Sequence, residues 1–178
     1  MFVPLDCSLL FTSRPEVLRR AFSLVPEYLR TERSGEVEDF MDYGVTLGRR
    51  FRALKLWMVL RYFGRQGLVA RLREHLRLAG LFAGWVDEHP DFERLAPVPM
   101  STVCFRARPT GVVEGELEIL NERLLEAVNL SGEVYLSHTR LAQRLALRLS
   151  ISGLRSEERH VRRAWEILQE KLQGLARR

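Results

Sequence analysis

Cysteine is scarce in this 178-residue sequence, and its scarcity excludes two kinds of small domain. The two cysteines, Cys7 and Cys104, lie far apart in the chain and form no Cys-x-x-Cys pair. A disulfide framework or a tetrahedral zinc site needs more thiols at closer spacing. The four histidines show no metal-ligand spacing either, so we expect no metal site. A chain with so few thiols fits the reducing cytoplasm.

Long apolar runs are also missing. No segment approaches the roughly 20 apolar residues of a membrane-spanning helix, so we expect no membrane partner. Residues 1–6 lack the basic region and the small-residue cleavage site of a signal peptide, and we expect none. Hydrophobic residues make up 46% and charged residues 29% of the chain. These values are ordinary for a soluble globular protein with one large or two small domains.

Lysine is rare, because Lys55 and Lys171 are the only two, and the net charge of +5 comes from arginine. Guanidinium groups bind phosphate well, so an arginine-rich nucleic-acid-binding module is one alternative. Such a module should carry interleaved exposed aromatic residues or a recognised motif, and the sequence shows neither. We therefore favour charges that are solvated on helix faces, and we expect no nucleic-acid partner.

The first half of the chain reads as one strand followed by helices. The apolar segment 2–11 predicts a buried strand, and Thr12, Ser13 and Pro15 predict the start of a helix that ends near residue 24. The polar residues 27–39 predict a loop.

Two long helices are expected next. Residues 49–63 are apolar nearly all round the helix, which predicts burial between two bodies. Gly64 and Gly67 bracket a turn, and residues 68–86 then carry a single apolar stripe that is typical of a surface helix. Nothing in the chain obviously covers the first of these helices, so we expect an exposed apolar surface and self-association.

From about residue 90 the apolar period changes to two, which indicates half-buried strands. The clear strands are 103–108 and 145–152, and the weaker candidates are 92–96 and 133–136. Apolar residues at helical spacing predict helices over 117–128 and 161–175, the second capped by Ser156. The pattern predicts a small α+β unit with an antiparallel sheet covered on one face by helices.

Several motifs carry a family resemblance. They are Asp6-Cys7-Ser8, Tyr28-Leu29, the run Leu-Gly-Arg-Arg-Phe-Arg-Ala-Leu-Lys-Leu-Trp from Leu47 to Trp57, the segment 103–106 and the segment 160–165. Together they resemble the group II decarboxylases of aromatic amino acids and histidine, which depend on pyridoxal phosphate (PLP). The resemblance covers nearly the whole chain in order, and the run from Leu47 to Trp57 is its most specific part.

The resemblance implies the C-terminal part of a fold-type I enzyme with α/β and α+β parts. Residues 1–89 would be the end of the large PLP-binding domain, including a catalytic loop over 27–43, and residues 90–178 would be the small α+β domain. The family has an Asn-Pro-His-Lys-Trp run before this segment, and its Schiff-base lysine would lie just upstream of Met1. We therefore expect the isolated chain to be inactive, and Met1 to be an internal methionine of a longer reading frame.

The resemblance also implies roles for three residues in the active site of the partner subunit of a homodimer. Tyr28 would donate the proton to the substrate's α-carbon, and Leu47 and Gly48 would reach the cofactor phosphate and the substrate pocket. Aldehyde-forming relatives tend to carry Phe in place of Tyr28, and histidine-specific ones tend to carry Ser in place of Gly48. The implied function is a cytoplasmic PLP-dependent carboxy-lyase that converts an aromatic amino acid to its amine. The alternatives are a non-catalytic remnant and an arginine-rich binding module.

Overall fold

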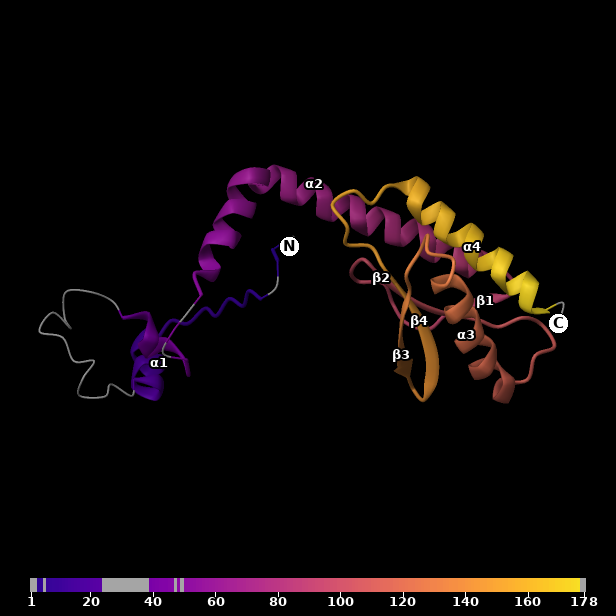
Figure 1. Cartoon of the computed structure of the whole chain (residues 1–178), viewed down its shortest axis with the longest axis horizontal. Helices are drawn as coiled ribbons and strands as arrows, with labels where there is room; N and C mark the ends of the chain where they lie inside the picture. The colour runs from indigo at the N-terminus through magenta and orange to yellow at the C-terminus, as the bar shows by residue number, and fades with distance from the viewer. Residues whose placement is uncertain (1–2, 5, 24–38, 47, 49, 177–178) are drawn as a thin grey trace, which may run out of the picture. The chain divides into compact units, whose positions relative to one another are not determined.

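The computed structural model describes residues 3–4, 6–23, 39–46, 48 and 50–176 (Figure 1). The chain divides into two compact units, Met1–Gly64 (unit 1) and Arg65–Arg178 (unit 2). The sequence places the change of domain later, after residue 89, because the character of the apolar pattern changes there. The helix between these two points belongs to unit 2 because its apolar stripe is buried in that unit's core. The division into enzyme domains at residue 90 stays a prediction.

Unit 2 contains a four-stranded antiparallel sheet in the order β1-β2-β4-β3. Its strands are β1 (Phe92–Arg94), β2 (Thr102–Ala107), β3 (Ser137–Leu141) and β4 (Arg144–Ser150). The sequence predicted β2 and β4 well and gave the position of β1. The strand predicted over 133–136 is wrong, because the strand begins at Ser137. Both backbone polar groups of Leu136 bind the side chain of Asn129 instead of a neighbouring strand.

Three helical segments cover the core of unit 2: the second half of α2 (Arg52–Glu88), α3 (Glu114–Asn129) and α4 (Glu158–Ala176). The two helices of unit 2 predicted by their apolar spacing, α3 and α4, are confirmed. Figure 1 shows them beside the sheet. Two hydrogen bonds join Glu157 and His160 at the start of α4. The backbone N–H of Glu157 donates to Nδ1 of His160, and the backbone N–H of His160 donates to the carbonyl oxygen of Glu157.

The core is formed by alternate sheet residues and by one stripe of each helix. Phe105 of β2 and Leu147 of β4 are fully buried, as are Phe82 of α2 and Leu168 of α4. The ring of Phe82 lies 5.2 Å from that of Phe105 and 5.6 Å from that of Trp165, edge to face in both pairs. Such geometry adds to the stabilisation from apolar burial itself, and it joins two helices to the sheet.

The two long helices expected from the sequence form one element, α2, that is broken at Gly64. Gly64 has a φ of 62° and a ψ of 175°, in the left-handed region that glycine adopts at no steric cost. All the buried residues of α2 follow this break, beginning at Leu68. The part predicted to be buried between two bodies therefore lies in unit 1 without burial by the described residues.

Unit 1 contains α1 (Pro15–Phe22), as predicted, and the 3-10 helix η2 (Phe40–Tyr43). The strand predicted over 2–11 is wrong, since the described residues of this segment form no strand and Leu9 and Leu10 are exposed. An isolated strand leaves its backbone groups unpaired, and the described part of unit 1 offers no strand to pair with it. The predicted loop 27–39 lies outside the described residues except for Asp39.

Asn121 of α3 ties this helix to the sheet. Its side chain is fully buried, accepts a hydrogen bond from the N–H of Ala107 at 2.7 Å and donates to the carbonyl oxygens of Ala107 and Leu117 at 2.8 Å. The amide thus satisfies both backbone groups of a residue at the end of β2.

Replacing Asn121 by Ala should lower the free energy of unfolding by about 2–4 kcal/mol, because buried backbone groups lose their partners and a cavity remains. Chemical denaturation followed by tryptophan fluorescence measures the change. The exposed Gln173→Ala on α4 is the control and should stay within about 0.5 kcal/mol of the wild type. Equal stability of N121A and wild type would show that the amide contributes nothing.

Arg106 of β2 is buried between two carboxylates. Its side chain is 5% exposed, its Nε donates to Glu93, and its two terminal nitrogens donate to the two oxygens of Glu114 at 2.6 and 3.0 Å. The hydrogen bonds from Arg106 hold the pKa of Glu114 below its ordinary value. This bidentate pair joins the start of α3 to the middle of the sheet.

The lowered pKa of Glu114 makes stability depend on pH. The stabilisation is complete above the ordinary carboxyl pKa and is lost as the pH falls towards the lower pKa of the folded state. We therefore expect Glu114→Gln to lessen the loss of stability between about pH 5 and pH 3. Urea midpoints measured across this range test the effect, with the exposed Glu116→Gln of the same helical turn as the control. Parallel pH curves for E114Q and wild type would contradict it.

Candidate functional site

The structure describes only one of the three site residues implied by the resemblance. Tyr28 and Leu47 lie outside the described residues. Gly48 is exposed, and a methyl group added to it would meet no atom within 4 Å. Nothing within the described chain therefore requires glycine at this position. The predicted role of Gly48 in the site of another subunit stays a prediction.

An ion pair joins the two described segments on either side of residues 24–38. Arg19 of α1 lies 3.5 Å from Asp42 of η2. Asp42 is buried in unit 1, with a relative exposure of 7%. A buried carboxylate requires a charged or hydrogen-bonding partner, and Arg19 supplies one. The pair connects α1 to η2.

A second ionic cluster lies at the start of α2. Nε and a terminal nitrogen of Arg52 each lie 2.8 Å from one carboxylate oxygen of Asp6, and Nζ of Lys55 lies 3.9 Å from the other oxygen. The hydrogen bond from Arg52 is the largest cause of the lowered pKa of Asp6. A helix N-terminus disfavours cations, and the carboxylate offsets this effect. The motif Asp6-Cys7-Ser8 thereby contributes an anchor for α2.

The described residues do not fit PLP. Covalent attachment of the cofactor needs a lysine amine in a cavity that also binds phosphate. Lys55 lies beside Asp6, and Lys171 lies on α4, where its charge acts on Glu133. Neither lysine lines any of the described cavities of unit 2. We therefore assign no step of cofactor chemistry to these residues.

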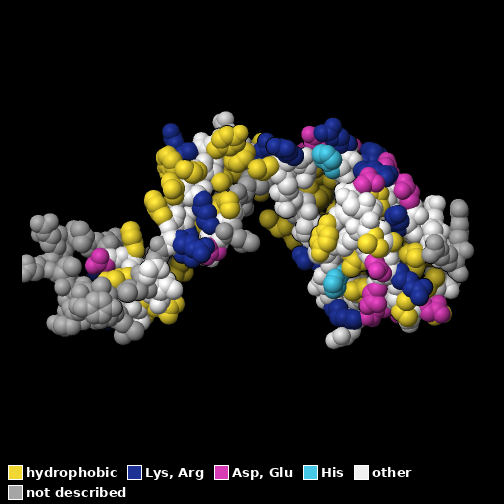
Figure 2. Space-filling model, in the orientation of Figure 1, with side chains coloured by type: hydrophobic (Ala, Val, Ile, Leu, Met, Phe, Trp, Pro, Cys, Tyr) yellow, Lys and Arg dark blue, Asp and Glu magenta, His cyan; other side chains and the backbone are white. Residues whose placement is uncertain are grey.

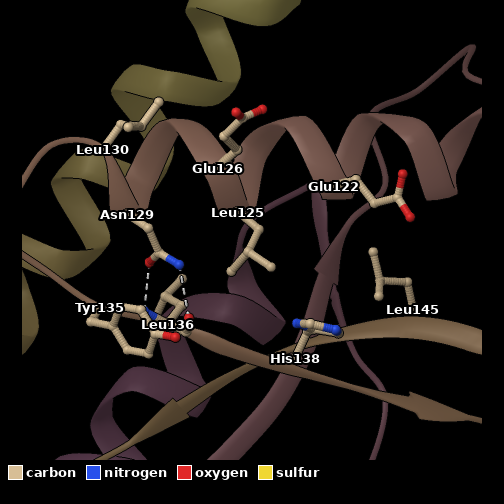
Figure 3. Close-up of a pocket in the computed structure, with 9 residues that line it drawn as sticks. All are labelled: Glu122, Leu125, Glu126, Asn129, Leu130, Tyr135, Leu136, His138 and Leu145. Carbon is tan, nitrogen blue, oxygen red and sulfur yellow. Dashed lines mark hydrogen bonds between the residues drawn. The ribbon is translucent and has the colours of Figure 1, made fainter.

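Unit 2 has a cavity of about 540 Å³ between α3 and the strands β3 and β4 (Figure 3). It is lined by Glu122, Leu125, Glu126, Asn129, Leu130, Tyr135, Leu136, His138 and Leu145. Leu125 and Asn129 point from α3 towards the strands, whereas the carboxylate of Glu126 points away from them. The amide of Asn129 is occupied by the backbone of Leu136. The size is typical of a small-molecule site, but these side chains form no nucleophile-and-base pair.

Three of the four histidines, His75, His89 and His160, have structural partners. Nε2 of the buried His75 lies 3.0 Å from the carbonyl oxygen of Gly153, and His160 caps the start of α4. The ring of His89 packs edge to face on Phe92 at 5.2 Å. Among the described residues, no three His, Cys, Asp or Glu side chains are grouped so that they could hold a metal ion. No helix in the same part of the chain is long and apolar enough to cross a membrane.

A family model and similar sequences of known proteins point to the same protein family. The pyridoxal-dependent decarboxylase conserved domain matches residues 1–108. The chain is 42% identical to a phenylacetaldehyde synthase of Arabidopsis thaliana over 93% of its own length and 34% of the relative's. It is 41% identical to tyrosine decarboxylase 2 of Narcissus pseudonarcissus over 93% of its length and 33% of the relative's.

Solved structures agree with the sequence relatives. Oryza sativa TDC with PLP and tryptamine matches 88% of this chain, with a TM-score of 0.81 and 35% identity, over 33% of its own length. Catharanthus roseus tryptophan decarboxylase in complex with L-tryptophan matches 90%, with a TM-score of 0.77 and 34% identity, over 32% of its own length. The chain spans about a third of the length of these relatives. The conserved domain covers more than half of the chain, and the resemblance read from its motifs is confirmed: this chain belongs to the pyridoxal-dependent decarboxylase family.

Proposed function

We propose that this chain is part of a PLP-dependent carboxy-lyase that converts an aromatic amino acid to its amine. The observation that carries the proposal is the match of the conserved domain to residues 1–108. Relatives are named as tyrosine and tryptophan decarboxylases, and a matching structure holds L-tryptophan. In this proposal the cofactor's lysine comes from the part of the enzyme that this chain does not span.

Overall identity does not separate amine formation from aldehyde formation. A phenylacetaldehyde synthase and a tyrosine decarboxylase match this chain at 42% and 41% identity. The difference must lie in single groups at the reacting carbon. The phenolic hydroxyl of Tyr28 can donate a proton to the substrate's α-carbon, whereas a phenyl ring cannot. Tyr28 therefore supports decarboxylation to the amine, and Gly48 supports an aromatic substrate over histidine.

We further propose that the whole enzyme is a cytoplasmic homodimer in which Tyr28, Leu47 and Gly48 act at the partner subunit's site. The open space around Gly48 supports this role, because a backbone without a side chain lets a ligand or a second subunit approach closely. The Arg19–Asp42 ion pair supports it as well, since it connects the described segments that flank Tyr28 in the sequence.

The isolated 178-residue chain should release no carbon dioxide from L-phenylalanine, L-tyrosine, L-tryptophan or L-histidine in the presence of PLP. The reason is that neither of its lysines lines any of the cavities described in unit 2, and Lys55 lies beside Asp6 instead. Radiometric assay of carbon dioxide tests this, with a tryptophan decarboxylase as the positive control. Turnover by the pure chain would contradict the assignment of the cofactor's lysine to another part of the enzyme.

The nucleotide sequence directly upstream of the Met1 codon tests the reading frame. In-frame codons for Asn-Pro-His-Lys-Trp would support the carboxy-lyase. An in-frame stop codon would favour the non-catalytic remnant instead.

Tyr28→Phe in the whole enzyme should lower amine formation by roughly 10²–10⁴-fold, the usual contribution of a general acid, and should raise aldehyde formation. Chromatography of the products measures both compounds. The control is Tyr135→Phe, which changes an exposed tyrosine of unit 2 and should leave the product ratio unchanged. If Y28F forms amine at the wild-type rate, Tyr28 does not donate the proton.

A further inference from the structure

Unit 1 leaves an unusual amount of apolar surface exposed. Among the described residues, every buried hydrophobic side chain lies at Leu68 or beyond. More than half of the large hydrophobic side chains that are exposed lie in the first 64 residues. Unit 2 therefore builds its own core, whereas unit 1 has apolar surface that its described residues do not cover.

This surface includes a stripe formed by the first turns of α2 and the residue directly before it, which we call the α2 stripe. It consists of Phe51, Leu54, Trp57, Met58 and Tyr62, with exposures of 74%, 40%, 57%, 54% and 83%. Spacings of three and four residues place these side chains on one face of a helix. Figure 2 shows hydrophobic side chains gathered on this part of α2. A contiguous exposed apolar face of this kind marks an interaction site.

The charged residues that the first half of α2 itself carries are all basic. No Asp or Glu occurs between Asp42 and Glu74 in the sequence. The guanidinium of Arg61 lies 5.9 Å from the ring centroid of Trp57, within reach of a cation–π contact. Asp6 already pairs with Arg52 and Lys55. The surface that covers the stripe should therefore be apolar at its centre and acidic only near Arg61.

The comparisons indicate what covers the stripe. The chain spans 33% of Oryza sativa TDC, which leaves about two thirds of that protein outside the match. The match covers 88% of this chain, more than unit 2 alone contains, so it includes part of unit 1. The conserved domain likewise covers all of unit 1. Part of unit 1 thus has a structural counterpart in a relative about three times as long.

We propose that the α2 stripe docks on the part of a pyridoxal-dependent decarboxylase that lies outside the region this chain matches. The proposal rests on family membership and on the proposed function. It holds whether that part belongs to the same polypeptide or to a separate one. A second copy of this chain is the competing occupant.

A chimera tests the proposal directly. Oryza sativa TDC, with its matched third replaced by this chain, would be compared with the isolated chain by hydrogen exchange. We expect the backbone amides of residues 52–63 to exchange at least roughly tenfold more slowly in the chimera, because docking stabilises the helix against local opening. Equal exchange rates in both proteins would overturn the proposal, as would an insoluble chimera beside a soluble parent enzyme.

A pair of variants separates docking from general stability. Trp57→Glu with Tyr62→Ser should lower the melting temperature of the chimera by several degrees and leave that of the isolated chain unchanged. The matched control is Leu130→Glu with Tyr135→Ser, because Tyr135 is 81% exposed and Tyr62 is 83% exposed. The control should leave the chimera unchanged. Equal shifts for both pairs would overturn the assignment to the stripe.

Light scattering of the isolated chain decides between the two occupants. A discrete dimer that the double change at Trp57 and Tyr62 dissociates would assign the stripe to a second copy and overturn the proposal. The exchange and melting measurements do not depend on turnover. A chimera that is protected at residues 52–63 but releases no amine would therefore support docking and contradict the proposed function.

Discussion

The packing of Phe82 between Phe105 and Trp165 is the constraint on which unit 2 depends. These three rings come from α2, β2 and α4, which are distant in the sequence, and their edge-to-face contacts hold two helices against the sheet. The surrounding aliphatic residues fill the space between them. Because α2 enters this core only after Gly64, the same packing decides where the compact unit begins. The first part of α2 takes no part in the core and presents its apolar face elsewhere.

Buried polar side chains set the position of α3 relative to the sheet, which apolar packing alone does not determine. Asn121 and Asn129 each use one side-chain amide to satisfy the N–H and C=O of a single sheet or loop residue. Arg106 joins β1, β2 and the start of α3 through its two carboxylate partners. Burial of such groups without partners would cost more than their hydrogen bonds contribute. They therefore fix the position of α3 relative to the strands.

The two units differ in how much of their apolar surface the described residues bury. Unit 2 has a core, a satisfied sheet and helices with local partners. Unit 1 is held by the ion pairs of Asp6 and Asp42 and lacks a buried apolar cluster among its described residues. This difference agrees with a family whose members are about three times as long. The residues to which the resemblance assigns a role in catalysis, Tyr28, Leu47 and Gly48, all fall in unit 1.

The sequence by itself determined the family, the helices α1, α3 and α4, and the strands β2 and β4. These features depend on local periodicity, on helix signals and on motifs that are contiguous in the chain. It misplaced β3, because the side chain of Asn129 takes the backbone groups of Leu136, and this contact is invisible in a local pattern. It also predicted a strand before α1, where the described residues of unit 1 offer no strand to pair with the apolar run. The glycines at 64 and 67 predicted a turn, and the structure has the break at Gly64. Only the tertiary structure decided which half of α2 is buried, because both halves are apolar and burial depends on what packs against them.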